Sequence, residues 1–380
     1  MFNILVAWRD RWSALRELNT IQRAEREIAR AKFDAIIEEA NGLFSQGNVR
    51  GARERLQRIR ASAGTDYATP GLLRLLLDLG DLDHAELLMQ RGHREKPRAL
   101  FFLEGLALVA QQRNDFEVAA DRWARFRKRF PAWPAGYSQG GVCLAKLGRL
   151  LEADRLLEKA IRSFPNDVIC HSEYAKVADI RGDLDEALRR WQLLQGVQGG
   201  GVITLAYQLG TIGLAQALRK LRRFDEAERH LKEMRAAHPL NILPAIELAG
   251  IAQDRGDVEE SVRRWQTVKS RFPLAPTGYS NLAALLKQHD RLAEAEEVLG
   301  DAVGRFEGDF TIAFEYADIA DRRQDWESAA QRWRDVRGRF PNHGDAYRRA
   351  ADALRKLGRT SEAEEVLEER RRISTQVTTG

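Results

Sequence analysis

The chain has 380 residues, of which 44% are hydrophobic and 31% are charged, a composition typical of folded rather than disordered proteins. Its net charge of +5 is small for this length and argues against a dedicated nucleic-acid binder. Two cysteines, Cys143 and Cys170, exclude a disulfide framework and fit a reducing compartment, so we expect a cytoplasmic protein.

The first segment, residues 1–31, is predicted to form an extra amphipathic helix. Its apolar stripe at helical spacing consists of Leu5, Trp8, Trp12 and Leu15. The longest apolar run, residues 4–8, is too short for a signal peptide or a membrane span. We expect this helix to cap the first repeat or to pair two chains. Peripheral membrane contact through residues 1–18 is the alternative, disfavoured because its arginines alternate with acidic residues.

From about residue 32 the sequence repeats itself, mostly every 34 residues. A small residue near acidic residues marks each copy: Ala85, Ala119, Ala153, Ala187, Ala227, Ser261, Ala295, Ala329 and Ala363. Five residues before the marker stand Gly80, Gly148, Gly182, Gly256 and Gly358. Twelve residues after it stand Pro97, Pro131, Pro165, Pro239, Pro273 and Pro341. Apolar residues at spacings of three and four lie on both sides of the glycine, so each copy is predicted to form two helices joined by a turn.

These small residues, turn glycines and terminal prolines resemble the tetratricopeptide repeat family over residues 33–377. The resemblance implies an all-α fold, a right-handed α-solenoid (superhelix) of about ten 34-residue helix–turn–helix repeats. Repeats 1–5 are expected within residues 32–195 and repeats 6–10 within residues 208–377. A disordered tail is expected at residues 378–380.

A longer period of two repeats runs through the array. Four residues after the marker stand Trp123, Leu157, Trp191, Leu231, Trp265, Leu299, Trp333 and Leu367. Nine residues before it, alanine accompanies each tryptophan and leucine accompanies each leucine. We interpret this as volume compensation in the core, so Trp191→Ala should cost about 3–5 kcal/mol and Ala178→Leu should overpack. The alternative is a row of aromatic stacking platforms. Trp133 and Trp326 fall outside this register and are better candidates for exposure.

The one irregular step, from Ala187 to Ala227, is 40 residues long. It contains Gly196 and Gly199 to Gly201, which predict a flexible loop and a lengthened helix over residues 196–207. The insertion is either a neutral length variation or a hinge or contact loop. No phosphate-binding glycine motif is present.

Motifs for catalysis or metal binding are absent from the sequence. Its seven histidines are scattered, and no nucleophile signature appears. Cys143 and Cys170 lie within predicted repeat helices and are expected to be buried small hydrophobic residues. We therefore expect no enzyme activity, no catalytic residue, no metal and no cofactor.

The resemblance also implies where a ligand binds. Tetratricopeptide arrays usually hold peptides or proteins on a concave surface lined by the first helix of each hairpin. The corresponding residues here are Lys176, Asp179, Arg219, Lys220, Gln253, Asp254, Asn281, Lys287, Phe314, Asp318, Asp321 and Arg322. Their mixed charge suggests a polar partner. The family's two-carboxylate clamp and its asparagine ladder are both missing, since Asn281 alone matches the latter.

Together these features predict a non-enzymatic scaffold or adaptor that binds a protein or peptide partner and no nucleic acid. The alternative is an accessory or regulatory subunit of an enzyme complex, such as envelope polysaccharide or glycosyltransferase machinery. Arginine greatly outnumbers lysine, which suggests a bacterial protein from a GC-rich genome.

Overall fold

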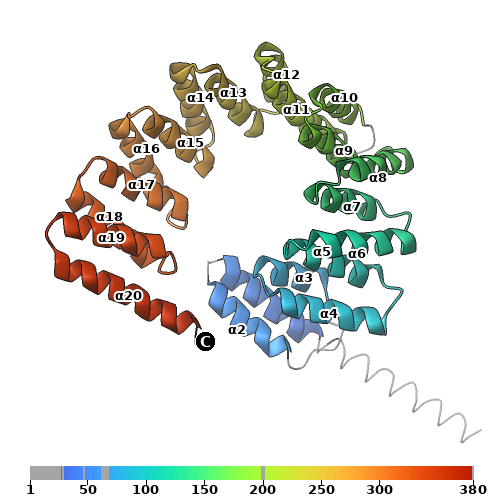
Figure 1. The fold of residues 1–380 in the computed structure, drawn as a ribbon, viewed down its shortest axis with the longest axis horizontal. Coiled ribbons are helices and arrows are strands. Elements are labelled where there is room, and N and C mark those ends of the chain that lie inside the picture. The colour runs from blue at the N-terminus through green and yellow to red at the C-terminus, as the bar shows by residue number, and fades with distance from the viewer. Residues whose placement is uncertain (1–26, 28–29, 46–47, 61–67, 198–201, 379–380) are drawn as a thin grey trace, which may run out of the picture. The chain divides into compact units, whose positions relative to one another are not determined.

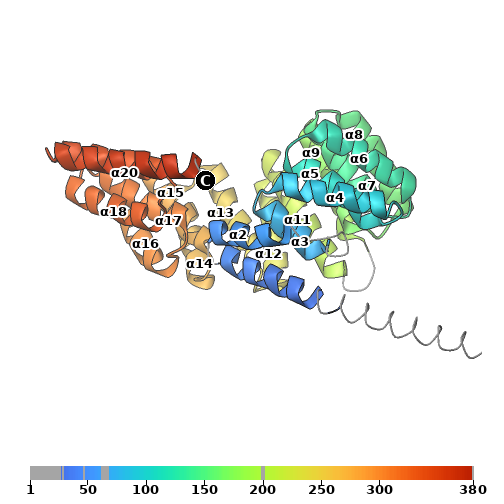
Figure 2. The same cartoon turned by 90° about the horizontal axis from the view of Figure 1, so that it is seen from below.

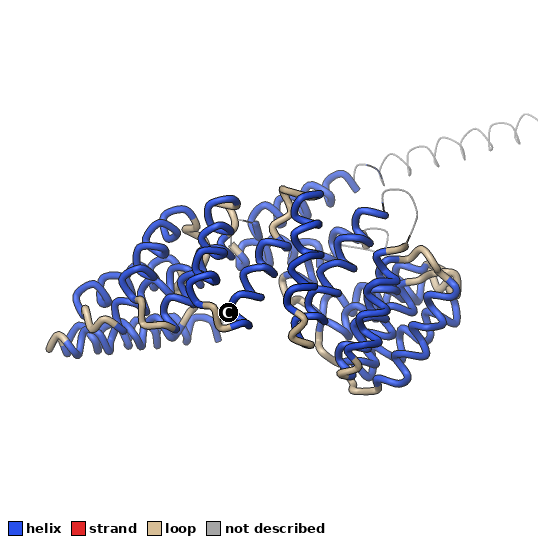
Figure 3. Tube along the Cα trace, turned by 90° about the horizontal axis from the view of Figure 1, so that it is seen from above, coloured by secondary structure: helices blue, strands red, loops and turns tan. Residues whose placement is uncertain are grey.

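The computed structural model describes residues 27, 30–45, 48–60, 68–197 and 202–378, and every element in this part of the chain is helical (Figure 3). The chain forms two compact units that divide between Asp183 and Leu184. Figure 1 labels the helices of both units along the chain. The N-terminal segment, apart from a few residues at its end, lies outside the described residues, so its predicted role stays a prediction.

Unit 1 begins with a helix over residues 30–45 and continues through eight further helices. These are α2 (Val49–Arg60), α3 (Pro70–Asp78), α4 (Leu82–Glu95), α5 (Leu100–Gln112), α6 (Phe116–Arg129), α7 (Ala135–Lys146), α8 (Leu150–Ser163) and α9 (Val168–Arg181). Each helix from α3 onward packs on the next one in sequence, and α7 also packs on α9. Such contacts between neighbours alone are typical of stacked hairpins, as predicted.

Unit 2 consists of helices of the same kind, most of which are labelled in Figure 2. These are α10 (Leu184–Gln195), α11 (Val202–Lys220), α12 (Phe224–Ala237), α13 (Leu243–Arg255), α14 (Val258–Arg271), α15 (Pro276–Gln288), α16 (Leu292–Arg305), α17 (Phe310–Arg322), α18 (Trp326–Arg339), α19 (Gly344–Lys356) and α20 (Thr360–Thr378). The all-helical, stacked-hairpin architecture is thus confirmed. The predicted disordered tail at residues 378–380 lies outside the described residues apart from Thr378, the last residue of α20, so it stays a prediction.

The turn inside each hairpin has a left-handed backbone. The five recurring glycines have φ angles between +71° and +80°, as expected for residues that end a helix in this conformation. Four turns hold a side-chain-bearing residue instead, with φ between 58° and 61°: Asn114, Arg222, Asp290 and Gln324. The turn geometry is therefore constant, whether or not a glycine is present.

The marker residues lie inside the stack of helices. All nine, from Ala85 to Ala363, are fully buried. Trp123, Trp191, Trp265 and Trp333 are buried as well, so they belong to the core and are not exposed stacking platforms. Ala110 shares a core cluster with Trp123, and Ala320 shares one with Trp333.

The two tryptophans outside that register differ from each other. Trp133 is 52% exposed, whereas Trp326 is half-buried, with the Lys356 ammonium 5.9 Å from its ring. Trp191 shows why a small residue is needed beside a core ring, because a Cβ at Gly213 would lie 2.2 Å from the indole.

The irregular step of the repeat coincides with a long helix. α11 has 19 residues, whereas the first helices of the other hairpins from α5 to α19 have 12 to 14. The glycine-rich residues 198–201 lie outside the described part of the chain, so a hinge or contact role there stays a prediction. No helix among the described residues is long and apolar enough to cross a membrane.

Candidate partner-binding face

In unit 2, the first helices of successive hairpins lie on the inner side of the curve made by this unit, and the second helices lie on the outer side (Figure 1). The first helices are α11, α13, α15, α17 and α19. We call their solvent-facing surface the inner face of unit 2. All the predicted binding residues except Lys176 and Asp179 belong to these helices; those two lie on α9 of unit 1.

A repeated contact joins neighbouring first helices. A residue near the end of one helix meets the residue 28 positions later on the next, and we call each such pair a rung. In unit 2, Arg219 forms an ion pair with Glu247, Lys287 with Glu315, and Arg349 with Asp321. The corresponding rung in unit 1 joins two amides, with Gln111 Nε2 donating to Gln139 Oε1 at 3.1 Å.

The rung at Arg219 extends into a small polar cluster between α11 and α13. The Arg219 guanidinium also contacts the Asp254 carboxylate at 2.8 Å, and Gln216 donates to Glu247 at 2.8 Å. Burial lowers the pKa of Arg219, but hydrogen bonds to Asp254 and Glu247 outweigh it and raise the pKa overall. Arg219 and Asp254, both predicted binding residues, are therefore paired with charges within the chain.

The rungs at Lys287 and Asp321 merge into a second cluster across α15, α17 and α19. Asp318 is buried and lies 3.5 Å from Lys287, 2.9 Å from Arg322 and 3.5 Å from Arg349. Burial lowers the pKa of Lys287 and raises the pKa of Asp321, although Trp333 Nε1 and Arg349 both donate to Asp321. The structure thus brings four predicted residues together in one ion network, in which Arg322 alone is exposed.

The remaining predicted residues have different surroundings. Phe314 packs in the core, 4.9 Å from Trp333 between ring centroids, and is only half exposed. Lys176 is exposed but forms an ion pair with Glu173 at 2.8 Å on its own helix. Asp179 is half-buried on α9, and Lys220 is exposed at the end of α11. Gln253 and Asn281 are exposed on α13 and α15.

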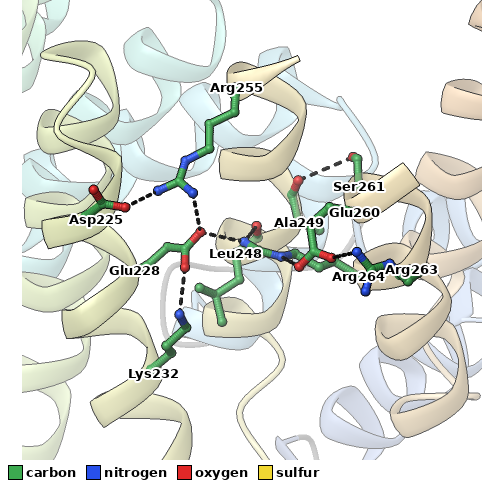
Figure 4. A network of polar contacts seen from close by, with 10 residues as sticks. All are labelled: Asp225, Glu228, Lys232, Leu248, Ala249, Arg255, Glu260, Ser261, Arg263 and Arg264. Carbon is green, nitrogen blue, oxygen red and sulfur yellow. Dashed lines mark hydrogen bonds and ion pairs between the residues drawn. The ribbon is translucent and has the colours of Figure 1, made fainter. Parts of the chain in front are cut away.

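A second polar arrangement lies between hairpins, and sequence reasoning missed it. Figure 4 shows it around Glu228 of α12, a carboxylate only 6% exposed. Arg264 lies 2.9 Å from this carboxylate, Lys232 2.7 Å and Arg255 3.6 Å. Arg264 also donates to the Leu248 carbonyl at 2.6 Å. Burial raises the pKa of Glu228, but the hydrogen bonds from Lys232 and Arg264 lower it overall.

The same arrangement occurs in two further places. Glu86 is held by Arg113 and Arg122 in unit 1, and Glu296 is held by Arg323 and Arg332 in unit 2. We call each one a carboxylate clamp. The spacing could have revealed it, since the acidic residue follows one marker by one position while the arginines stand six before and three after the next marker.

Other chemistry is sparse in the described part of the chain. No group of three or more histidine, cysteine or acidic side chains there could hold a metal ion. Cys143 and Cys170 are fully buried, as predicted, and burial raises the pKa of Cys143 to about 11 and that of Cys170 further. A hollow of about 220 Å³ between α12 and α14 is lined mainly by charged stems and is open to solvent. The geometry favours surface contact over enclosed small-molecule binding.

Comparison with known proteins agrees with the repeat architecture. A family model described as tetratricopeptide repeat matches residues 314–374. No curated protein matches the sequence. A tetratricopeptide repeat protein from Parabacteroides merdae is 16% identical with a TM-score of 0.42, and the match covers 67% of this chain and 98% of the other.

Two further solved structures are similar to a comparable degree. A thermophilic tetratricopeptide repeat protein from Thermus thermophilus is 20% identical with a TM-score of 0.39, over 48% of this chain and 96% of the other. Yeast Tom70 is 13% identical with a TM-score of 0.35, over 89% of this chain and 91% of the other.

Tetratricopeptide repeat proteins are generally non-catalytic and bind proteins or peptides. The family match at residues 314–374 falls on α17 to α20, whose hairpins have the same markers, left-handed turns and neighbour packing as the rest of the described array. Residues 314–374 therefore match the tetratricopeptide repeat family, and the other described hairpins share their turn geometry and packing.

Proposed function

We propose that this protein is a non-catalytic adaptor that binds a protein partner on the inner faces of its first helices. The observation that supports the proposal is the row of exposed polar side chains on consecutive helices of one face, exemplified by Gln253, Asn281 and Arg322 in unit 2. Lys176 contributes in the same way in unit 1. Such a row offers hydrogen bonds along several repeats, which suits an extended polypeptide better than a compact metabolite.

The internal ion networks modify the predicted binding surface. Asp318 and Lys287 stabilise contacts between helices, so they position the face and are not offered to the partner. The partner-contacting set is accordingly smaller than the sequence predicted, and its members are the exposed residues. An accessory role in an enzyme complex, including envelope polysaccharide machinery, remains the alternative identity of the partner. No residue described here favours it specifically.

A capture experiment tests the proposal. Full-length wild type would be compared with an inner-face variant carrying Lys176→Ala, Gln253→Ala, Asn281→Ala and Arg322→Ala. The matched control would carry Lys159→Ala, Glu233→Ala and Glu297→Ala, three exposed positions on second helices. Quantitative mass spectrometry of captured proteins should show partners that the inner-face variant loses and the control retains.

The contrary result is equally clear. Partners held equally by all three chains would place the binding surface elsewhere. Circular dichroism must first show the same helix content in every chain. The identity of the lost proteins would then decide between a general adaptor and a subunit of an enzyme complex.

A further inference from the structure

One edge of unit 1 is strongly basic. It is formed by the last turns of α4 and α6 and by the loops that follow them, over residues 91–98 and 125–134. These two segments contain eight arginine and lysine residues and one acidic residue, Glu95. The helices α4 and α6 are second helices of consecutive hairpins, and Arg122 of α6 forms an ion pair with Glu86 of α4. Their ends therefore lie at the same edge of the stack, which we call the basic edge.

Much of the positive charge at the basic edge is available to a ligand. Four exposed cations there have no acidic partner in the described part of the chain: Arg94, Arg98, Lys128 and Arg129. The turns inside the same hairpins, at the opposite edge, are different. There Arg113 forms an ion pair with Asp83, and Glu117 lies 3.4 Å from Arg149 of the next hairpin. Charge at the turn edge is thus used to join hairpins.

Helix ends explain only part of this charge. Cations are favourable near the C-terminal end of a helix, which suits Arg94 and Arg129. Arg98, however, directly precedes Ala99, the N-cap of α5, where the helix dipole disfavours positive charge. The repeat does not require cations either, because the corresponding residues 301–310 of unit 2 contain three acidic residues and one arginine. The basic edge is therefore a local feature of unit 1.

An exposed aromatic ring lies within the basic edge. Trp133 is 52% exposed in the loop between α6 and α7, and no residue in the described part of the chain accepts from its indole N–H. Pro131 and Pro134 flank it and restrict the backbone of the loop. An amphipathic ring of this kind is typical of the boundary between water and lipid, where its apolar body and its N–H both find suitable surroundings.

The extent of the basic edge favours a lipid surface over a nucleic-acid strand. A strand would follow a row of cations that continues along successive repeats. Here the next segment, residues 159–168, contains two cations and Asp167, and one of these cations, Arg162, is paired with Glu158. A membrane surface needs only a compact patch, with cations for the lipid phosphates and an amphipathic ring between the headgroups.

From these observations we infer that the basic edge of unit 1 binds the surface of a membrane that contains anionic lipids. The four exposed cations bind lipid phosphates, and the Trp133 ring inserts at the depth of the headgroups. The contact uses the loops between hairpins and not the exposed face of the first helices. This inference goes beyond the proposed adaptor function, because it gives the adaptor a place of action.

Binding to vesicles tests the inference. The full chain would be sedimented with vesicles of phosphatidylcholine containing about 30% phosphatidylglycerol, and with phosphatidylcholine alone. It should bind the anionic vesicles only, and less so as NaCl rises from about 0.05 to 0.3 M, because salt screens the attraction. The variant with Arg94→Gln, Arg98→Gln, Lys128→Gln and Arg129→Gln should bind at least about a hundredfold more weakly, at about fivefold per cation.

Two control variants make the loss specific. The first carries Lys146→Gln, Arg155→Gln, Arg229→Gln and Arg339→Gln, which remove the same charge from exposed positions outside the basic edge. The second carries Trp8→Ala and Trp12→Ala, which test the membrane contact considered for residues 1–18. Both should bind anionic vesicles about as wild type does, and circular dichroism should show equal helix content in all chains.

A second readout follows the aromatic ring. Phosphatidylcholine brominated near the headgroup end of its acyl chains should quench part of the tryptophan fluorescence of the bound wild type. Trp133→Leu should lose this quenching at a lipid concentration where it is still bound, because core rings such as Trp123 are buried in the protein.

Three results would overturn the inference. The first is equal vesicle binding by the basic-edge variant and its charge-matched control. The second is a loss confined to the Trp8→Ala/Trp12→Ala variant, which would assign the contact to residues 1–18. The third is no vesicle binding by wild type, whether or not the basic edge captures an acidic peptide or an oligonucleotide. Partner capture by the inner face is measured separately, so the proposed function can stand when the membrane contact fails, and the reverse.

Discussion

The hairpins α11–α12 and α13–α14 are neighbours with the same turn geometry, yet they present opposite charges to each other. α12 supplies the buried carboxylate Glu228, and the next hairpin supplies Arg255 and Arg264, which hold it. The start of the second helix differs as well. Asp257 caps α14 by accepting from the Glu260 N–H, whereas Arg223 precedes α12 and pairs with Glu226.

The same two types alternate along the described array. Hairpins with a core tryptophan have aspartate caps at Asp115, Asp257 and Asp325, and hairpins with a core leucine have Arg149, Arg223, Arg291 and Arg359 at that position. The clamp carboxylate of a leucine-type hairpin needs a tryptophan-type hairpin beside it, because the positions that hold the clamp arginines contain no arginine in the leucine type. The pair of hairpins is therefore the unit that specifies register, and the core volumes and the clamps alternate together.

The largest expected effect comes from substitutions that disrupt the alternation of large and small core residues between hairpins. Trp333→Ala should cost about 3–5 kcal/mol, because the indole packs against Phe314 and is fully buried. Ala320→Leu alone should cost about 1–3 kcal/mol by overpacking. The double change Ala320→Leu/Trp333→Leu recreates the other hairpin type, so urea unfolding should show a cost well below the sum of Ala320→Leu and Trp333→Leu. Additive costs would contradict volume compensation.

The next effect comes from the clamp. Glu228→Gln should lower the free energy of unfolding by about 2 kcal/mol, because two arginines and a lysine lose their shared anion while partly screened by solvent. The control is Glu233→Gln on the same helix, which is exposed and should change stability by less than about 0.5 kcal/mol. Equal urea midpoints for the two variants would mean that the clamp does not stabilise the stack.

The clamp also predicts a pH dependence. The folded pKa of Glu228 lies below its unfolded value, so its contribution is present above the unfolded pKa and is lost as the pH falls through the folded one. The stability gap between wild type and Glu228→Gln should therefore shrink as the pH falls below about 5.

Glu104 should show the opposite pH dependence of stability, because burial raises its pKa and favours its protonated form. Glu104→Gln should be stabilising at neutral pH, and that gain should disappear on acidification.

The sequence alone predicted the fold well, because its strongest signals are local and repeated. The buried Ala153, the left-handed Gly148 and the core Trp123 each recur at a fixed phase, so one physical reading explains many copies. Phe314 was predicted to line the concave surface, and the structure shows its half-buried ring packed on Trp333. Helical phase alone does not reveal that a neighbouring ring is within reach.

The candidate site was only partly predictable for a related reason. Lys287 and Asp318 were correctly placed on first helices, but whether they face a partner or each other depends on the 28-residue offset between helices. The sequence did not show that residues 28 positions apart would be paired, because this depends on how neighbouring first helices pack. The clamp on Glu228 was missed because its arginines stand on the next hairpin, so the contact depends on how the two hairpins stack.

The smallest expected effect concerns the left-handed turn inside each hairpin, whose backbone geometry is the same in both hairpin types. Gln324 holds a left-handed backbone with φ of 59° between α17 and α18, where five other turns have glycine. A left-handed L-residue costs about 1–2 kcal/mol, and the greater freedom of glycine in the unfolded chain offsets part of the gain. Gln324→Gly should therefore raise the free energy of unfolding by about 0.5–1 kcal/mol, and Gly256→Ala should lower it by a similar amount. Since both turns lie in tryptophan-type hairpins, a loss of stability in Gln324→Gly would show that the turn, too, depends on its own side chain.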